Sequence, residues 1–229
     1  MEKVYFPVFL DIKDKLCVVV GGGKVAERKI FSLIEAGARV KVIAPEVLDS
    51  IRALAEEGKI ELEEREYKKG DLEGARLVIA ATNNQEVQKK VYEEAEERGI
   101  FCNVVDVPEL CSFIVPSVVR RGPLCIAIST SGKAPAVAKR LRQMLESKFG
   151  EEYEAYLNLM GKIRELVLRM NISQEEKHLK LNRLALAPIL DCIKYGDIEL
   201  LKAILESEGL SEALALSELP FPNTSAKET

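Results

Sequence analysis

Residues 16–29 of the chain read LCVVVGGGKVAERK. A short run of mostly β-branched residues ends at three glycines, and a helical pattern begins directly after them. Apolar or small residues then recur at the spacing of one helix face, at Ala26, Ile30, Leu33, Ile34 and Gly37. This succession of strand, glycine turn and helix predicts the first unit of a nucleotide-binding α/β fold.

The glycine turn matches the pattern G-x-G-x-x-A through Gly21, Gly23 and Ala26. Gly21 is expected to make the tight turn, and Gly23 to let the backbone approach a pyrophosphate. Ala26 would keep the helix close to the strand, so that the N–H groups at the helix start face the phosphates. We therefore predict a dinucleotide site here. The alternative is a plain strand-to-helix turn, because many loops contain three glycines.

A second strand is predicted over residues 38–44. In dinucleotide-binding folds this strand is followed by an acidic residue that binds the adenosine ribose. Here the strand stops at Pro45, and the acid, Glu46, is displaced past the proline. No arginine follows immediately to bind a 2′-phosphate, which favours NAD over NADP.

The remaining pattern of the first half completes the sheet. Further strands are predicted at residues 60–67, 76–81 and 100–105, and helices at residues 47–57 and up to Gly99. A short lead-in strand is expected within residues 1–15, with Tyr5, Phe6 and Phe9 on the sheet. The order predicts an α/β fold with a Rossmann-type, mostly parallel sheet.

Ligands of such sheets bind at the carboxyl ends of the strands. Thr82 and Asn83 follow one strand there, and Asp106 follows another just before a Val-Pro pair. Apart from Glu46, no other carboxylate comes so soon after a strand, which makes Asp106 the candidate catalytic residue. The alternative is an aspartate that only stabilises a turn or caps a helix.

The character of the chain changes after residue 115. Arg121-Gly122-Pro123 predicts a hairpin, so this part of the sheet is expected to be antiparallel. A hydroxyl-rich loop then opens a helix that has Pro135 in its first turn. The loop consists of Ser129, Thr130, Ser131, Gly132 and Lys133.

The segment from Arg120 to Leu145 contains no Asp or Glu. Its basic residues are Arg120, Arg121, Lys133, Lys139, Arg140 and Arg142. Together with the hydroxyl-rich loop, they predict a carboxylate or phosphate site. A solvated basic helix face, or one paired with acids of another subunit, is an equally good interpretation.

Composition limits the function classes. The 229 residues are 47% hydrophobic and 31% charged, and the formal net charge of −4 argues against a basic nucleic-acid binder. Five cysteines include no C-x-x-C pair, which predicts buried thiols in a reducing cytosol and no metal site. No apolar run reaches the roughly 20 residues that span a bilayer, and no signal peptide is recognisable. We expect a cytoplasmic protein.

The C-terminal third has only helical patterns. Its single histidine, His178, lies in a charged stretch and is expected at the surface. We predict an NAD-binding domain over residues 1–115, a dimerisation and substrate-binding segment over 116–150 and a helical domain over 151–216. Residues 217–229 are predicted to be a flexible tail.

Several stretches together resemble one known family. They are GGGKVAERK (21–29), AATNN (80–84), CNVVDVP (102–108), SFIVPS (112–117) and ISTSGKAP (128–135), in that order. The combination is similar to the precorrin-2 dehydrogenase family, whose module also forms the N-terminal part of siroheme synthase. The resemblance covers about residues 4–150.

The resemblance implies NAD-dependent oxidation of precorrin-2 to sirohydrochlorin, and in some members insertion of ferrous iron to give siroheme. It also implies a homodimer in which the segment after about residue 115 is exchanged. It makes Asp106 the acid–base residue. Carried over by position, Gly21, Gly22, Gly23, Lys24 and Val25 would surround the pyrophosphate, with Pro45 and Glu46 on the adenosine side. Thr130 replaces a loop serine that some members phosphorylate.

Two other functions are compatible with the motifs. A non-catalytic NAD-sensing regulatory domain would use the same glycine turn only as a switch. A dehydrogenase of short substrates is the third interpretation, but no Tyr-x-x-x-Lys motif and no histidine lies near the predicted cleft.

Overall fold

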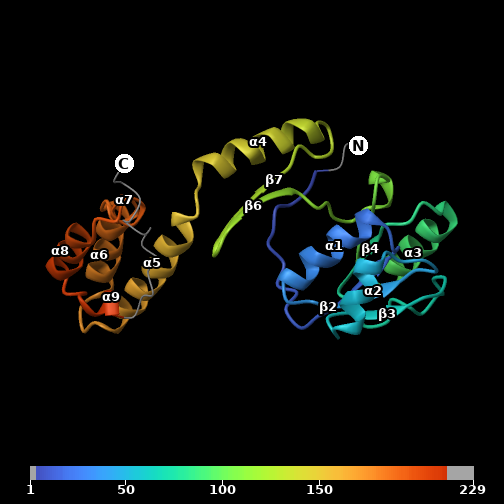
Figure 1. Ribbon diagram of the computed structural model, residues 1–229, viewed down its shortest axis with the longest axis horizontal. Coiled ribbons are helices and arrows are strands. Elements are labelled where there is room, and N and C mark those ends of the chain that lie inside the picture. The colour runs from blue at the N-terminus through green and yellow to red at the C-terminus, as the bar shows by residue number, and fades with distance from the viewer. Residues whose placement is uncertain (1–3, 216–229) are drawn as a thin grey trace, which may run out of the picture. The chain divides into compact units, whose positions relative to one another are not determined.

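A computed structural model describes residues 4–215 of the chain (Figure 1). The chain divides into two compact units, Met1–Val115 and Pro116–Thr229. The predicted tail, residues 217–229, lies outside the described residues.

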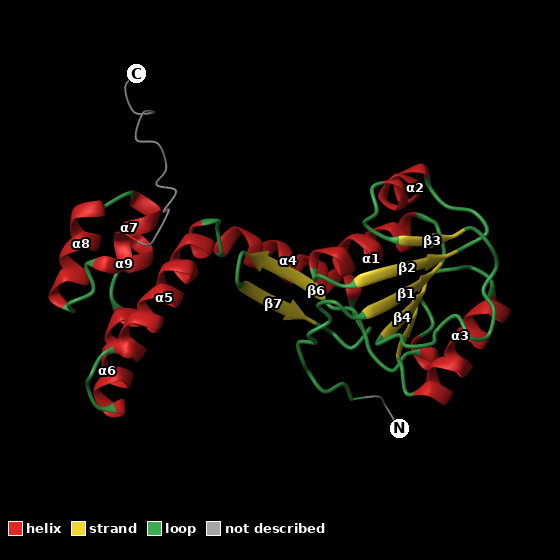
Figure 2. Cartoon of the chain, turned by 90° about the horizontal axis from the view of Figure 1, so that it is seen from below, coloured by secondary structure: helices red, strands yellow, loops and turns green. Residues whose placement is uncertain are grey.

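The sheet of the first unit has five parallel strands in the order β3-β2-β1-β4-β5 (Figure 2). The strands are β1 (Leu16–Val20), β2 (Arg39–Ile43), β3 (Glu61–Glu63), β4 (Leu77–Ala80) and β5 (Phe101–Val104). The helices are α1 (Lys24–Glu35), α2 (Asp49–Glu56) and α3 (Gln85–Arg98). The chain builds outward from β1 on one side and then crosses to β4 on the other, so the strand order reverses at the carboxyl ends of these two strands, where ligands of such sheets bind. The predicted Rossmann-type sheet is confirmed.

Both faces of this sheet are covered by helices. In β1, Cys17 and Val19 belong to the core that α1 and α2 complete, whereas Val18 and Val20 pack on the side of α3. All four side chains are buried. A strand that is buried on both faces needs no polar alternation, which explains the continuous apolar run before the glycines.

The prediction of a lead-in strand before β1 is wrong. Residues 4–12 form no strand, and Phe6 and Phe9 are 85% and 74% exposed. β1 already pairs with β2 on one side and β4 on the other, so it offers no free edge. Pro7 also lacks the N–H group that a strand needs for its ladder.

The second unit begins with a hairpin of β6 (Ser117–Arg121) and β7 (Leu124–Ile128), which pair antiparallel around Gly122. The hairpin forms a separate two-stranded sheet, so its predicted place in the main sheet is wrong. The linking segment contains a 3-10 turn (Pro108–Leu110) and Pro116, which interrupt any ladder continuing from β5.

The rest of the second unit is helical, as predicted. The helices are α4 (Pro135–Lys148), α5 (Glu152–Arg169), α6 (Gln174–Leu186), α7 (Ile189–Tyr195), α8 (Ile198–Ser207) and α9 (Glu212–Ala215). A core centred on Leu159 and Ile163 of α5 joins these elements from α5 onward. His178 is exposed on α6, as expected. Within residues 4–215, no helix is both long and apolar enough to cross a membrane.

Candidate functional site

The glycine turn between β1 and α1 is tightly enclosed at its first two residues. Gly21 has a φ of +132° and donates its N–H to the Ile43 carbonyl at 2.9 Å. A Cβ atom at Gly21 would overlap the Ala81 carbonyl oxygen, and one at Gly22 would overlap the Glu46 carbonyl oxygen. Only glycine fits at these two positions, because the turn is pressed between the ends of β2 and β4.

Gly23 differs from its neighbours. It is exposed, its φ is −88°, and no atom lies within 4 Å of the position that a Cβ would take. It is the N-cap of α1 without a side chain to cap the helix. The first N–H groups of α1 therefore face an open space, as at a phosphate site. Free backbone donors beside an unobstructed glycine are what a pyrophosphate requires.

Two predicted cofactor residues adjoin the turn. Glu46 places its carbonyl against Gly22, and the N–H of Leu48 donates to the Gly22 carbonyl at 3.0 Å. The side chains of Pro45 and Glu46 are exposed. The structure therefore brings the displaced acid next to the glycines, even though it follows a proline.

Thr82 and Asn83 extend the same edge of the sheet. The N–H of Ala81 donates to the Val20 carbonyl at 2.8 Å, which fixes the chain directly before Thr82 beside the glycine turn. The Thr82 carbonyl accepts a hydrogen bond from the Gln88 side chain at 2.7 Å. Asn83 is exposed, while Asn84 caps α3 by accepting from two backbone N–H groups. Asn83 is thus the member of this stretch whose side chain faces solvent without a capping role.

Asp106 follows β5 in a turn that closes with the Val107 N–H donating to the Val104 carbonyl at 3.2 Å. Its φ is +62°, and its side chain is exposed. Left-handed backbone is uncommon outside glycine and often marks a functional constraint. The Val105 N–H bonds the Ala80 carbonyl at 2.9 Å, so Asp106 lies at the carboxyl edge that also holds the glycine turn.

A buried cysteine holds this turn, which the sequence pattern did not indicate. The Cys111 sulfur lies 3.3 Å from the Val104 nitrogen, 3.2 Å from the Val104 oxygen and 3.3 Å from the Val107 oxygen. The thiol therefore contacts the backbone on both sides of Asp106. No spacing or motif distinguishes Cys111 from the other cysteines, so only the structure reveals this contact.

The thiols in the sheet are unsuited to nucleophilic chemistry. Burial raises the pKa of Cys17 to about 11 and that of Cys102 to about 12. The neighbouring Cys111 also raises the pKa of Cys102, but by less than burial does. Both groups stay protonated at neutral pH. All five cysteines are free, and four of them are buried. Among residues 4–215, no group of three or more His, Cys, Asp or Glu side chains could hold a metal ion.

The predicted substrate loop lies in the second unit, apart in the chain from the other candidate residues. Ser131 and Gly132 have φ values of +52° and +81°. The Ser129 hydroxyl accepts the Ser131 N–H at 2.9 Å, and the Thr130 hydroxyl accepts the Ala134 N–H at 3.2 Å. The loop leads into α4, whose N-cap has no side-chain hydrogen bond. Two of the three hydroxyl groups thus shape the loop itself.

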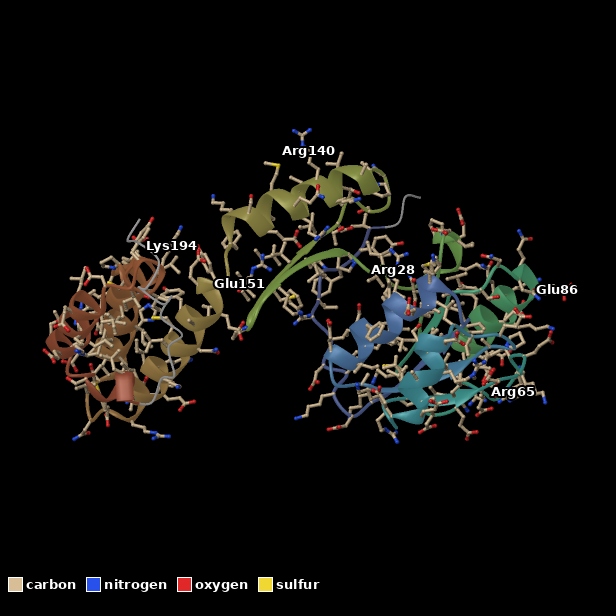
Figure 3. All side chains as sticks on the ribbon, in the orientation of Figure 1. Arg28, Arg65, Glu86, Arg140, Glu151 and Lys194 are labelled. Atoms are coloured by element: carbon tan, nitrogen blue, oxygen red, sulfur yellow. The ribbon has the colours of Figure 1, made fainter. Side chains whose placement is uncertain are left out.

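The basic residues near this loop differ in their environment. Arg142 pairs with Glu146, and Arg121 donates to the Glu146 carbonyl at 3.2 Å. Arg140 projects outward from α4 into solvent (Figure 3). Part of the basic segment is therefore neutralised by an acid that directly follows it in sequence, and part remains exposed.

Comparison with known proteins supports the nucleotide site and extends beyond it. A family model described as putative NAD(P)-binding matches residues 8–117, and one described as sirohaem biosynthesis protein central matches residues 121–148. Siroheme synthase of Vesicomyosocius okutanii is 39% identical over 204 residues, covering 89% of this chain and 44% of the relative. Siroheme synthase of Methylobacillus flagellatus is 43% identical over 161 residues, covering 70% of this chain and 34% of the relative.

A solved structure, SirC, precorrin-2 dehydrogenase, is similar with a TM-score of 0.75 and 29% sequence identity. The match covers 88% of this chain and 100% of that one. The chain thus spans less than half of the siroheme synthases that it matches, but the whole of this structural neighbour.

Proposed function

We propose that this chain, which belongs to the family of the precorrin-2 dehydrogenases and the N-terminal module of siroheme synthase, catalyses the NAD-dependent oxidation of precorrin-2 to sirohydrochlorin. One observation carries the proposal. An open glycine turn and an exposed aspartate in a left-handed turn lie at the same edge of the parallel sheet.

The cofactor NAD, when bound, supplies the acceptor for a hydride that leaves the macrocycle. The chain would hold its pyrophosphate with the backbone N–H groups of Gly23, Lys24 and Val25. Pro45 and Glu46 would border its adenosine side, beside Gly22. Thr82 and Asn83 would line the same edge at the end of β4.

Asp106 would take a proton from the macrocycle during the oxidation. Its carboxylate is exposed, and no described residue among 4–215 donates a hydrogen bond to it, so it is available to a substrate. If ferrous iron is inserted as a second substrate, the same carboxylate would accept pyrrole protons as the metal enters.

The acidic groups of the substrate would be bound by the second unit. Precorrin-2 carries eight carboxylates, and the loop Ser129–Lys133 offers backbone N–H groups at the start of α4. The exposed cations of α4, Lys139 and Arg140, add positive charge. The alternative remains a solvated basic helix face, which binding measurements on loop variants would distinguish.

We also infer that the chain works as a homodimer. Val137, Leu141 and Met144 form an apolar stripe along α4 and are 50%, 40% and 57% exposed. In the hairpin, Val118, Leu124 and Ile126 are only half-buried. Apolar surface of this kind on two adjoining elements is typical of an interface between subunits. A cytoplasmic location remains a prediction.

The decisive experiment compares the wild type with Asp106→Asn, measuring absorbance changes with precorrin-2 and NAD. Asparagine tolerates left-handed backbone and keeps the size of the side chain, but it cannot accept the proton. We expect turnover to fall by about 10²–10⁴-fold, with NAD affinity unchanged. Asp14→Asn is the matched control, because Asp14 is an exposed aspartate with a φ of +58° at the other edge of the sheet.

Each outcome has a defined meaning. If the wild type forms no NADH, the oxidation is excluded, and NAD binding without turnover would support the regulatory domain. If Asp106→Asn turns over as fast as Asp14→Asn, the role of Asp106 is excluded while the oxidation stands.

A further inference from the structure

The first unit contains an open surface cavity of about 670 Å³ at the amino ends of its strands, and the cations that line it are exposed. The glycine turn and Asp106 lie at the opposite, carboxyl ends, so this cavity is separate from the nucleotide site. Its volume is within the range of pockets that bind small molecules. Four cationic side chains line it, from Lys15, Arg39, Arg76 and Arg98, with Asp14 as the only acidic residue of the lining.

The register of the sheet brings these cations to the same end of neighbouring strands, with Arg39 and Arg76 on either side of Leu16 and Lys15 one residue before it. The Arg39 N–H donates to the Lys15 carbonyl at 2.9 Å, and the Arg76 N–H donates to the Leu16 carbonyl at 2.7 Å. The strands β2, β1 and β4 are neighbours in the sheet (Figure 2), and each begins at or directly after a cation. Adjacent strands are about 4.8 Å apart, which brings three positive side chains to one opening.

The cations lack local neutralisation. Within residues 4–215, Lys15, Arg39 and Arg76 form no ion pair with a carboxylate. Arg98 is held in place by Glu94, at 2.8 Å between Nε and Oε1. Its position in the last turn of α3 is explained by the helix dipole. That explanation does not apply to Arg39 and Arg76, which stand at strand starts.

From this arrangement we infer that the cavity binds a compact polyanion, a small molecule that carries phosphate groups or several carboxylates. Guanidinium groups match both kinds of oxyanion with paired N–H donors. Arg39 and Arg76 would grip the ligand from two strands, and Lys15 between them would add a third positive charge. The site is independent of the proposed oxidation.

The test is a calorimetric titration of the full chain with pyrophosphate and, separately, with citrate. Saturating NAD is present so that the glycine turn is covered. We expect binding of at least one anion, and a loss of affinity of about tenfold or more in Arg39→Gln/Arg76→Gln, because charge-assisted hydrogen bonds are removed. Preference for pyrophosphate or citrate would distinguish a phosphorylated ligand from a polycarboxylate.

The control is Lys69→Gln/Lys89→Gln, which removes two charges from exposed positions outside the cavity. The affinity of this control variant for the anion is expected to stay within about twofold of the wild-type affinity, because solvent and salt screen charges that lie outside the cavity. Thermal unfolding of both variants verifies that they are folded. Failure of the wild type to bind either anion, or equal losses in both double variants, would overturn the inference. If the chain does not oxidise precorrin-2 but binds the anion equally well with and without NAD, the inference still stands, because the two sites are separate.

Discussion

Single residues set the shape of the nucleotide site. Gly21 and Gly22 are required by the protein itself, since a side chain at either would overlap a carbonyl oxygen of a neighbouring segment. Gly23 is not required by the protein, because the space beside it is open. The three glycines therefore serve different purposes, although they are adjacent in sequence.

This difference predicts that alanine at Gly21 lowers the stability of the protein, whereas alanine at Gly23 weakens NAD binding. Gly21→Ala should lower the free energy of unfolding by about 2–4 kcal/mol, since it adds a clash to a left-handed backbone. Gly23→Ala should change it by less than about 1 kcal/mol, but should weaken NAD binding about tenfold or more by narrowing the approach of the pyrophosphate. Urea denaturation and NAD titration measure the two effects. Normal NAD affinity in Gly23→Ala would contradict the assigned pyrophosphate position.

We expect Cys111 to act as a positioning residue for Asp106 in the proposed oxidation. Cys111→Ala removes a thiol that contacts both Val104 and Val107, so the turn should loosen and kcat should fall by about tenfold. The KM for NAD should not change. Cys111→Ser keeps a hydrogen-bond donor and acceptor at this position and should restore most of kcat. If Cys111 only filled space, serine would not restore it.

Cys192→Ala is the control for thiol removal, because Cys192 is equally buried but lies in the second unit. If it lowers kcat as much as Cys111→Ala does, the effect is general destabilisation. Equal activity of Cys111→Ala and wild type would exclude the positioning role.

At the scale of elements, α3 is fastened to the segment after β3 by a buried carboxylate. Glu94 is 2% exposed and accepts hydrogen bonds from the Tyr67 hydroxyl at 2.5 Å and the Gly70 N–H at 2.9 Å. Arg98 donates from one turn later at 2.8 Å. Burial alone would raise the pKa of Glu94, but these three donors outweigh it and hold the pKa below its usual value.

Glu94→Gln should therefore destabilise the protein by about 2–4 kcal/mol near neutral pH. A carboxyl with a lowered native pKa stabilises the fold above its unfolded pKa, and this contribution is lost as the pH falls through the native pKa. The difference between wild type and variant should thus shrink on acidification toward about pH 4 and below. Urea denaturation over this pH range measures it, with the exposed Glu93→Gln as control. A constant difference would show that the charge is unimportant.

At the scale of the whole molecule, the apolar stripe of α4 stays about half exposed within the part of the chain that the structure describes. Val137, Leu141 and Met144 recur at the spacing of one helix face, and the adjoining hairpin is half-exposed. A monomer would leave this surface in water, whereas a dimer would bury it.

Leu141→Glu should dissociate the proposed dimer, because burying an unpaired carboxylate in an apolar interface is unfavourable. Light scattering after gel filtration should show a dimer for the wild type and a monomer for the variant. Leu186→Glu, at a leucine of α6 that is 88% exposed, should remain dimeric. A monomeric wild type would exclude the dimer, and a dimeric Leu141→Glu would place the interface elsewhere.

The sequence by itself determined the parallel sheet of the first unit and its glycine turn. Both depend on local patterns, which are apolar strands, helix periodicity and glycine at positions that admit no side chain. The same logic located Asp106 at a strand end and the hairpin around Gly122. The resemblance carried by five short stretches then indicated the family.

The tertiary structure alone decided the features that arise from pairing between distant segments. The residues that contain Phe6 and Phe9 look like a strand, yet they form none, and β1, the strand that follows them, is paired on both sides. Cys111 reaches the Asp106 turn only after a 3-10 turn folds the chain back. Lys15, Arg39 and Arg76 become neighbours through the register of three strands, which no local pattern encodes. Periodicity records which face of an element is buried, but not which element lies next to it.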